Sequence, residues 1–359
     1  MTTIRAAICR AFGEPLSVEE VTLRPPAQGE VEVTLEAVAI CHSDISYAEG
    51  IWGGVLPAVY GHEAVGRVSA AGPGVQGLAP GARVVATLIK ACGHCACCGA
   101  GRPVACEGPR AEAGPMTDTS GAALAEPLQI GAFAERIVVD QSQVVAVPEE
   151  MPAEAAALLA CGVITGVGAA VNAAKLRAGE DVVVIGAGGV GLNAIQGARI
   201  AGARRIVAVD MTEAKLEDAR AFGATDGVLA TKPEPWTAAK ELLGRRADAV
   251  FVTVGAVRAF TEAPNYLAAG GRVIMVGMPA VGAIVEYEPV NLAALGQSLI
   301  GSKMGDSVIA RDIPWLVDLY GQGRLKLDEL VSNRWTLDQI NEAFADTKAG
   351  AARRNVIVF

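Results

Sequence analysis

Positive charge is scarce in this sequence and nowhere concentrated. The 359 residues contain 30 lysines and arginines against 39 aspartates and glutamates, which gives a formal net charge of −9. A chain of this sign, without a basic cluster, is a poor partner for nucleic acid or for an anionic membrane. We therefore expect its partner to be a small molecule.

Signals for export and for membrane insertion are also missing. The first residues, MTTIRAAICRAF, lack the layout of a signal peptide. We expect no apolar run of the roughly 20 residues needed to cross a bilayer. The sequence therefore predicts a cytoplasmic protein. In that reducing compartment the eight cysteines are expected to be metal ligands rather than disulfides.

The length predicts about two domains, since single hydrophobic cores stop growing near roughly 250 to 300 residues. Residues 1 to about 150 contain short strand-like runs, such as 31–39 and 66–70, which glycine and proline interrupt. Such runs favour a β-rich, partly open barrel. No internal repeat and no low-complexity tail is evident beyond the two similar halves of the nucleotide-binding unit described next.

The pattern changes near residue 152, where two helical runs begin, 153–159 and 164–174. Strands and helices then alternate from Asp181 to about Leu299, which is the order of an α/β unit with a parallel sheet. Residues 300–359 return to mixed structure and finish on an expected strand. The α/β unit is therefore expected to be inserted into the β-rich domain.

A dinucleotide-binding pattern lies in DVVVIGAGGVGLNAIQGARIAGARRIVAVD, residues 181–210. A buried strand leads into a GxGxxG turn, whose glycines permit the tight turn, the approach of a pyrophosphate and close packing of the next helix. That helix points its unpaired N–H groups and the positive end of its dipole at the phosphates. The turn residues assigned to the cofactor are Gly186, Gly188, Gly189, Val190 and Gly191.

The second strand of this unit ends at Asp210, nineteen residues after Gly191. A carboxylate at this place accepts hydrogen bonds from the ribose hydroxyls and repels a 2′-phosphate, which favours NAD over NADP. Glycine-rich turns without a ligand are common. Here, however, strand, turn, helix, strand and terminal acid follow in the order that dinucleotide binding requires.

A local metal pattern lies within KACGHCACCGAGRPVAC. Four thiolates this close can form a closed tetrahedral zinc site, and a closed site leaves no position for substrate, so its role would be structural. The alternative, reduced thiols without metal, would expose several neighbouring thiols to oxidation. The expected ligands are Cys92, Cys95, Cys98 and Cys106, and Cys97 and His94 are spare candidates.

A second set of candidate ligands is dispersed along the chain. Cys41 begins CHSDIS, His62 and Glu63 lie in YGHEAVG, and Cys161 lies in LLACGVITG. Each cysteine alone is more often an ordinary core residue. Together the three zinc-type ligands form a Cys2His set, which leaves one coordination position open for water or a substrate oxygen; alcohol dehydrogenase is the standard example of this set.

These motifs together resemble the zinc-dependent alcohol dehydrogenases of the medium-chain dehydrogenase/reductase superfamily, essentially from end to end. The resemblance is carried by CHSD, GHEAVGRV, the four-cysteine loop, CGVITGVGAAVNAAKL, IGAGGVG with Asp210, and ARRNVIVF. It is closest to the class III branch, which handles thiol adducts of formaldehyde. The implied fold is a GroES-like catalytic domain with both zinc sites, residues 1–160 and 300–359, and an inserted Rossmann NAD-binding domain, residues 161–299.

The resemblance also implies roles for residues around the catalytic zinc. Cys41, His62 and Cys161 would bind the metal, with Asp44 as the acceptor behind His62. The catalytic residues would be Ser43, His42 and Glu63, of which Ser43 hydrogen-bonds the substrate oxygen and passes its proton to the cofactor ribose. Zinc would act as a Lewis acid while hydride moves from the carbinol carbon to C4 of the nicotinamide.

Further roles concern the cofactor and the substrate. Thr165 and Val190 would press on the nicotinamide ring, and the pocket residues would be apolar, which suits an uncharged alcohol or aldehyde. The other cofactor residues would be Asp210 and Lys215 at the adenosine ribose, His42 and Arg354 at the pyrophosphate, and Val254. The pocket residues would be Trp52, Leu88 and Met278.

Two departures from the family pattern bear on mechanism and substrate. Many relatives end a proton relay at a histidine where this chain has Ser46, so either water or His42 would finish it. Arg110 falls where glutathione-adduct enzymes keep an arginine, but their acidic residues are missing from EGIWGGVLP, which has only Glu49. An S-(hydroxymethyl)thiol, of glutathione or mycothiol, is therefore the second candidate substrate, with nitrosothiol reduction as its counterpart.

Two remaining expectations concern role and assembly. Some superfamily members bind NAD(P) without catalytic zinc and act as reductases or structural proteins, but they lack the Cys2His set that this chain keeps. Two zinc ions per chain are therefore expected. The apolar AVGAIVEYEPV run within residues 282–301 is suited to an edge strand that must be covered. A homodimer is the default expectation, and a tetramer is possible.

Overall fold

The computed structural model describes residues 1–110 and 113–359. These residues divide into two compact units, which are described separately below. The first contains 1–161, 308–323 and 327–359, and the second contains 162–307 and 324–326. The sequence-based boundaries lay at 160/161 and 299/300, so residues 300–307 and 324–326 belong by contact to the nucleotide-type unit.

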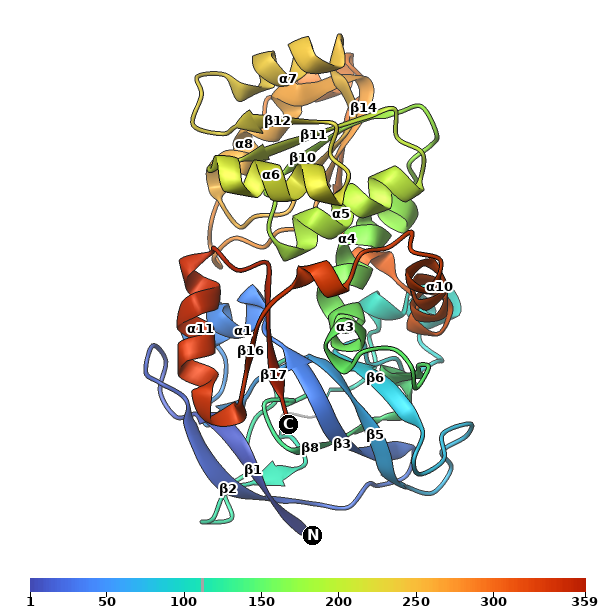
Figure 1. Ribbon diagram of the computed structural model, residues 1–359, viewed down its shortest axis with the longest axis vertical. Coiled ribbons are helices and arrows are strands. Elements are labelled where there is room, and N and C mark those ends of the chain that lie inside the picture. Colours follow the sequence, from blue (N-terminus) through green and yellow to red (C-terminus); the bar gives the residue numbers. More distant parts are fainter. Residues whose placement is uncertain (111–112) are drawn as a thin grey trace. The chain divides into compact units, whose positions relative to one another are not determined.

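The first unit is built mainly from antiparallel strands. Within the described residues, one sheet has the order β4-β1-β2-β7, and a larger sheet has the order β16-β17-β3-β5-β6-β9 with β8 paired to β3 (Figure 1). The strands are β1 (Thr2–Cys9), β2 (Ser17–Leu23), β3 (Glu30–Ala39), β4 (Ala58–Val59), β5 (Glu63–Ala71), β6 (Arg83–Thr87), β7 (Met116–Thr117), β8 (Arg136–Asp140), β9 (Val144–Ala146), β16 (Val331–Trp335) and β17 (Arg354–Val358).

Short helices connect and cover these strands. They are α1 (His42–Ala48), α2 (Ala96–Gly99), α3 (Ala153–Leu158), α10 (Ile309–Gly321) and α11 (Ile340–Ala349). The chain's last strand, β17, pairs antiparallel with β3 from the N-terminal half, so the two ends of the sequence share one sheet. The core between the sheets is filled by apolar side chains such as Ile8, Val33, Tyr60 and Phe133.

The second unit is a parallel sheet with the strand order β12-β11-β10-β13-β14-β15. Its strands are β10 (Asp181–Ile185), β11 (Arg205–Asp210), β12 (Asp226–Leu229), β13 (Ala247–Val252), β14 (Leu267–Met275) and β15 (Ser298–Gly301). Its helices are α4 (Ile164–Gly168), α5 (Gly189–Ile200), α6 (Glu213–Phe222), α7 (Pro235–Leu243), α8 (Val257–Glu262) and α9 (Pro289–Ala294).

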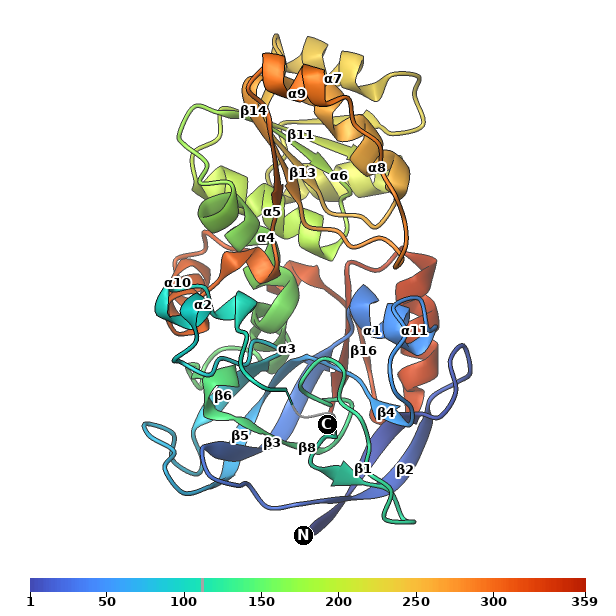
Figure 2. The same ribbon diagram turned by 180° about the vertical axis from the view of Figure 1, so that it is seen from behind.

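Local sequence explains this order. The DVVVI segment of β10 is buried throughout, as expected for a central parallel strand covered on both faces. The views from opposite sides show α6 in front of the sheet in Figure 1 and α8 in front of it in Figure 2. Helix α6 is capped at its N-terminus by Thr212, whose hydroxyl accepts from Lys215 N–H, and at its C-terminus by Gly223 with φ 117°.

The helical run from residue 153 is less regular than its sequence suggests. After α3 the chain forms a π-helix, Leu159–Val163, and after α4 it forms another, Ala169–Ala173. The combined helix, Ala153–Ala173, is long and apolar enough to cross a membrane, so the expectation that no apolar segment reaches that length was wrong. It is nevertheless 89% buried inside the protein over its most apolar window, as the core helix of a soluble protein is.

Candidate active site and metal centres

The dispersed candidate site begins at the N-terminus of α1. Cys41 stands at the N-cap position with extended backbone angles, φ −110° and ψ 153°. Three residues later, the Asp44 carboxylate accepts the Cys41 backbone N–H at 2.9 Å. This reciprocal cap fixes the start of the helix. The cap therefore fixes the position of the Cys41 thiol, two residues after the end of β3.

Asp44 also fixes His62, which precedes β5. Its buried carboxylate accepts the Gly61 N–H at 2.9 Å and contacts His62 Nδ1 at 2.9 Å. With Nδ1 donating to a carboxylate, the lone pair of His62 lies on Nε2. That Nε2 is buried and has no hydrogen-bond partner among the described residues. A buried nitrogen left unpaired in this way is suited to a metal ion.

The remaining donors gather around this nitrogen. One ligand atom from each of Cys41, His62, Glu63 and Cys161 lies within 4.8 Å of all the others, and all four residues are buried. A tetrahedral zinc site with Zn–S bonds of about 2.3 Å spaces its donor atoms about 3.8 Å apart. Two thiols, a free imidazole nitrogen and a nearby carboxylate therefore fit zinc in both chemistry and size.

The chain reaches this site a third time through an irregular helix. Cys161 lies in the π-helix Leu159–Val163 that follows α3. Such widened turns are rare and occur frequently at functional sites, because the extra residue changes the direction of a side chain. In this unit the π-turn is the segment that carries the second thiol to Cys41.

Electrostatics within the cluster favour the thiolate of Cys41, whereas the hydrogen bond with Cys41 and burial raise the pKa of Cys161. A hydrogen bond from Cys161, opposed by burial and assisted by His62, lowers the pKa of Cys41. Burial alone would lower the pKa of His62, but the Asp44 carboxylate outweighs it and the net shift is upward. A metal cation would bind the Cys41 thiolate and would take the place of the second proton that the Asp44 carboxylate favours on His62.

Glu63 is paired with the last strand of the chain. Arg354, at the start of β17, donates to its carboxylate, and both side chains are buried. Burial raises the pKa of Glu63 to about 7, although the Arg354 charge opposes this shift. The resemblance assigned Arg354 to the cofactor pyrophosphate, and the pairing with Glu63 was not anticipated. The Nε of Arg354 is buried without a hydrogen-bond partner among the described residues. The binding of pyrophosphate by Arg354 stays a prediction.

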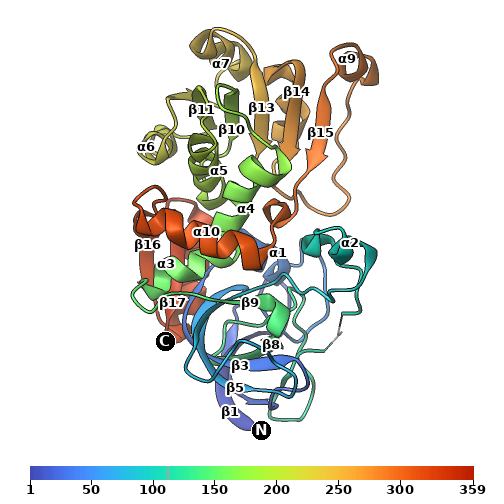
Figure 3. The same ribbon diagram turned by 90° about the vertical axis from the view of Figure 1, so that its right-hand side faces the viewer.

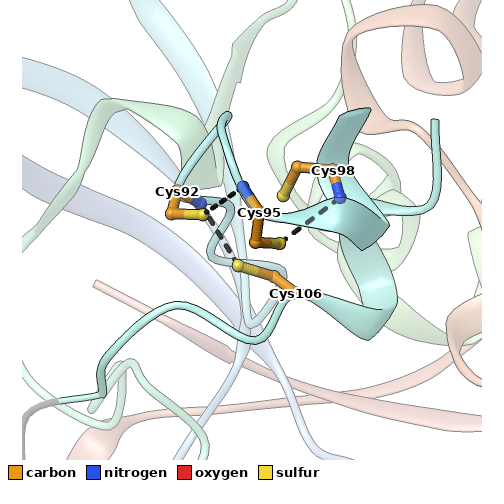
Figure 4. A group of neighbouring side chains, drawn as sticks. All are labelled: Cys92, Cys95, Cys98 and Cys106. Carbon is orange, nitrogen blue, oxygen red and sulfur yellow. Dashed lines mark hydrogen bonds between the residues drawn. The ribbon is translucent and has the colours of Figure 1, made fainter. Parts of the chain in front are cut away.

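The local cysteine cluster has a different construction (Figure 4). The thiols of Cys92, Cys95, Cys98 and Cys106 lie within 4.8 Å of one another and point toward a common centre. Backbone N–H groups donate to the sulfurs, from Cys95 to Cys92 Sγ at 3.3 Å and from Cys98 to Cys95 Sγ at 3.4 Å. Such bonds from Cys98 and Glu107 lower the pKa of Cys95 to about 6.

This cluster also fits zinc, with every position filled by protein. Four converging sulfurs stabilised by N–H donors match a closed tetrahedral thiolate site. Gly108 is needed nearby, because a Cβ there would lie 2.7 Å from Cys92 Cβ. The two spare candidates stay outside the group: His94 Nδ1 instead contacts the Cys92 carbonyl at 2.8 Å, and Cys97 is half-buried elsewhere on the loop.

In the second unit, the glycine turn after β10 has the geometry of a dinucleotide site. Gly186 has φ 98°, and Gly188 caps the N-terminus of α5. A Cβ at Gly191 would overlap the Gly186 carbonyl, and one at Gly186 would overlap Val254. Gly186, Gly191 and Val254 therefore form one close-packed group. The N–H groups at the start of α5 offer an anion site.

Asp210 is held beside that turn by its own backbone surroundings. One carboxylate oxygen accepts Ala187 N–H at 2.6 Å, and the other accepts Met211 N–H at 2.7 Å. The carboxylate is therefore fixed at the carboxyl end of the sheet, where doubly wound folds bind nucleotides. Lys215, the other predicted ribose contact, lies half-buried in the first turn of α6.

The other predicted residues are less concentrated. Ser43 and exposed His42 open α1 beside Cys41, and Thr165 is buried in α4 of the second unit. Arg110 is exposed. Of the three predicted pocket residues, Leu88 packs against the first unit's core, Trp52 meets Tyr47 edge-on with ring centroids 5.3 Å apart, and Met278, in the second unit, is 63% exposed.

Three residues were missed by sequence reasoning. Tyr47 stacks on Tyr60 and meets Trp52 edge-on. In the sequence, the available signal for Tyr47 was its position three residues after Asp44. Ser302, after β15, keeps a buried hydroxyl without a partner among the described residues. Glu126 lies in a loop, and burial raises its pKa to about 8. No sequence pattern marks Ser302 or Glu126, because the surroundings of each depend on distant segments.

Comparison with known proteins agrees with this construction. The alcohol dehydrogenase GroES-like domain matches residues 27–149, and the zinc-binding dehydrogenase domain matches residues 189–321. The chain is 35% identical over 364 residues to the NDMA-dependent alcohol dehydrogenase of Amycolatopsis methanolica, which covers 99% of this chain and 98% of that protein. It is 32% identical over 375 residues to the S-(hydroxymethyl)glutathione dehydrogenase of Paracoccus denitrificans, with 99% of each covered.

A solved structure extends the likeness to the whole fold. Benzyl alcohol dehydrogenase from Acinetobacter calcoaceticus matches with a TM-score of 0.94 and 30% identity, over 100% of both chains. The predicted combination of a GroES-like domain with a Rossmann domain is thereby confirmed, as is the resemblance read from the motifs. The chain belongs to the zinc-binding alcohol dehydrogenase family and is an oxidoreductase of alcohols and aldehydes.

Proposed function

We propose that the protein is an NAD-dependent alcohol dehydrogenase that holds two zinc ions per chain, one catalytic and one structural. The observation that carries this proposal is the unpaired, buried Nε2 of His62, within 4.8 Å of the Cys41 and Cys161 thiols. Buried polar atoms are ordinarily hydrogen-bonded, and the two thiols beside this nitrogen are the other ligands that a zinc ion needs. Cys41, His62 and Cys161 would hold the catalytic ion, and the four-cysteine loop would hold the structural one.

Several side chains of the protein would have separate roles at the catalytic site. Zinc, when bound, supplies a Lewis acid for the substrate oxygen. Asp44 keeps His62 in the tautomer that ligates, and Arg354 balances the charge of Glu63 next to the ligands. Ser43, half-buried in the first turn of α1, would take the hydroxyl proton in oxidation and return it in reduction. Water would carry the proton onward from there, and His42, exposed one residue earlier, is the alternative carrier.

NAD is favoured over NADP by the second unit. NAD, held by this unit, would supply the acceptor for the hydride. The Asp210 carboxylate is oriented by two backbone N–H groups and is free to accept from ribose hydroxyls, whereas a 2′-phosphate would meet its negative charge. The glycine turn, Val254 and the start of α5 would bind the pyrophosphate and the adjoining ribose, and Thr165 would contact the nicotinamide.

An uncharged primary or secondary alcohol is the substrate class that we favour. Trp52 is held edge-on by Tyr47, which supports a rigid aromatic wall rather than a charged one. A benzyl alcohol dehydrogenase is among the solved relatives, and aromatic alcohols therefore belong in the first assay. Leu88 and Met278 would complete the apolar lining.

The second candidate function is oxidation of an S-(hydroxymethyl)thiol. It is supported by exposed Arg110, which could meet a thiol's carboxylate, and by the name of the Paracoccus relative. The stretch between the two catalytic motifs offers only Glu49 as an acid, and Lys348 already pairs with it. This arrangement gives the thiol adduct less support than a free alcohol.

The test is NADH formation at 340 nm with short, long and aromatic primary alcohols, secondary alcohols, and formaldehyde with and without glutathione or mycothiol. We expect free alcohols to react and chelation to abolish the rate. Rates found only with formaldehyde plus a thiol would establish the second candidate. Because the Amycolatopsis relative is named an NDMA-dependent alcohol dehydrogenase, the assay is also run with NDMA as the electron acceptor. Activity that survives complete zinc removal would support a zinc-free reductase instead.

We also propose that the protein is a cytoplasmic homodimer. Strand β15 ends the strand order of its sheet (Figure 3), and α9 beside it has no buried residue. Val281 and Ile284 are 78% and 80% exposed in the same stretch. A second copy would cover this edge and its apolar side chains. Light scattering should give twice the chain mass, and Ile284→Asp should shift it toward the monomer; a monomeric wild-type protein would contradict the proposal.

A further inference from the structure

Three consecutive residues of the second unit adopt left-handed backbone angles. They are Met304, Gly305 and Asp306, with φ 49°, 63° and 47°, in the segment that follows β15. Only glycine adopts this region without cost, so two of the three positions are strained. Such strain persists only where the surroundings enforce it, and it is found most often at functional sites.

Helix α4 enforces this turn. A Cβ at Gly305 would lie 2.8 Å from Gly168 Cα, and a Cβ at Gly168 would lie 2.8 Å from Ser307 Oγ. Two glycines therefore face each other and let the backbones approach closely. The Asn172 side chain donates to the Gly305 carbonyl at 3.2 Å, and buried Ser307 donates to the Ile164 carbonyl at 3.4 Å. The turn is thus held by Asn172 of the following π-helix and by the Ile164 carbonyl of α4.

The turn delivers one side chain to α4. Buried Met304 places its Sδ 3.6 Å from Thr165 Oγ1, and the hydroxyl donates to it. Thr165 is also largely buried. Threonine in a helix ordinarily divides between two χ1 rotamers, because its hydroxyl can instead bond a carbonyl of the preceding turn. A sulfur acceptor supplied by another segment selects one of these rotamers and so fixes the direction of the Thr165 methyl group.

We propose that Met304 is a positioning residue for cofactor binding, which acts by fixing the rotamer of Thr165. The inference rests on the proposed function, in which Thr165 contacts the nicotinamide. The strained turn is what brings the sulfur to the hydroxyl, and the facing glycines are what keep the turn in place. The rigid methyl then meets the cofactor without an ordering cost at the moment of binding.

The test is a double-mutant cycle read by NADH affinity, which does not require turnover. Met304→Leu keeps the volume and apolar character of the side chain but removes the acceptor. Thr165→Val keeps the branched shape but removes the donor. We expect Met304→Leu to raise the Kd for NADH about threefold in the wild-type background and to have no effect in the Thr165→Val background.

Met151→Leu is the matched control, because Met151 is a buried methionine of the first unit. It should leave the Kd unchanged, and melting temperatures should show that all variants fold. Equal effects of Met304→Leu in both backgrounds, or none in either, would overturn this inference alone. Absence of NADH binding by the wild-type protein would overturn the proposed function together with it.

Discussion

The two cysteine-containing clusters differ in how far apart their residues lie in the sequence and in how deeply they are buried. The four-cysteine loop takes all its ligands from residues 92–106, is half-buried, and holds its sulfurs with backbone N–H groups. The other cluster collects Cys41, His62, Glu63 and Cys161 from distant segments, and all of them are buried. The first depends on local turns, and the second depends on the packing of a whole domain.

Under the proposed function, this difference separates a structural role from a catalytic one. Four thiols fill a tetrahedral shell, so a metal there can only stabilise its loop. Two thiols and one imidazole leave a position open, and the neighbouring groups, Asp44, Glu63 and Arg354, tune charge and tautomer. Mutations should therefore divide into those that remove activity and those that remove stability.

The largest effect is expected from Cys161→Ser. Loss of a buried thiolate ligand should release the catalytic ion and lower kcat/KM for alcohols by about a thousandfold or more. The melting temperature should change little, because the four-cysteine loop is untouched. Steady-state kinetics with calorimetry checks both points. A variant with more than a tenth of wild-type activity would contradict the assignment.

Cys95→Ser should give the opposite outcome. The remaining three thiols cannot close the shell, and the free energy of unfolding should fall by about 3 kcal/mol. The fraction that stays folded should keep kcat/KM within about threefold of wild type. Denaturant unfolding followed by kinetics on the folded protein measures both quantities. A loss of activity as large as that of Cys161→Ser, without a loss of stability, would erase the distinction between the sites.

Asp44→Asn is expected to have an intermediate effect. The amide keeps the shape and a hydrogen bond to His62, but it removes the negative charge that orients and polarises the imidazole. Substitutions of this kind lower metal affinity or activity about 10- to 100-fold. Zinc competition with a chelator measures the affinity. An unchanged affinity would show that backbone packing alone positions His62.

The smallest effect concerns Ser46, half-buried in α1. Because no histidine occupies this position, alcohol oxidation should show no pH limb from a relay histidine. Ser46→His should add one near its ordinary pKa of about 6.5, with the rate falling below that pH as the imidazole becomes protonated and can no longer accept a proton. The pH profile of kcat/KM decides, and identical profiles for both proteins would defeat the prediction.

The features that the sequence predicted are those that depend on residues close together in the chain, as in the four-cysteine loop. The spacing of Cys92, Cys95, Cys98 and Cys106 predicted their convergence, because a short glycine-rich loop leaves few other arrangements. The order of strand, glycine turn, helix and Asp210 predicted the second unit for a similar reason. These features depend on neighbours in the sequence, and residues 181–210 contain all that is needed.

Long-range contacts could not be predicted in this way. Cys41, His62 and Cys161 came together through a family resemblance, since spacing alone favours an ordinary core role for each cysteine. The pairing of Glu63 with Arg354 depends on β17 joining β3 across the sheet. The π-helices within 153–173 were not anticipated, because apolar helical periodicity does not distinguish an α-turn from a widened one.

Zinc content tests the central claim most directly, because it counts both sites without relying on a substrate. Metal analysis by mass spectrometry should find two zinc ions per chain in the wild-type protein. It should find one in Cys161→Ser and one in Cys95→Ser, each at the site left intact. A wild-type protein with a single zinc ion that Cys161→Ser retains would contradict the account, because the buried cluster would then hold no metal.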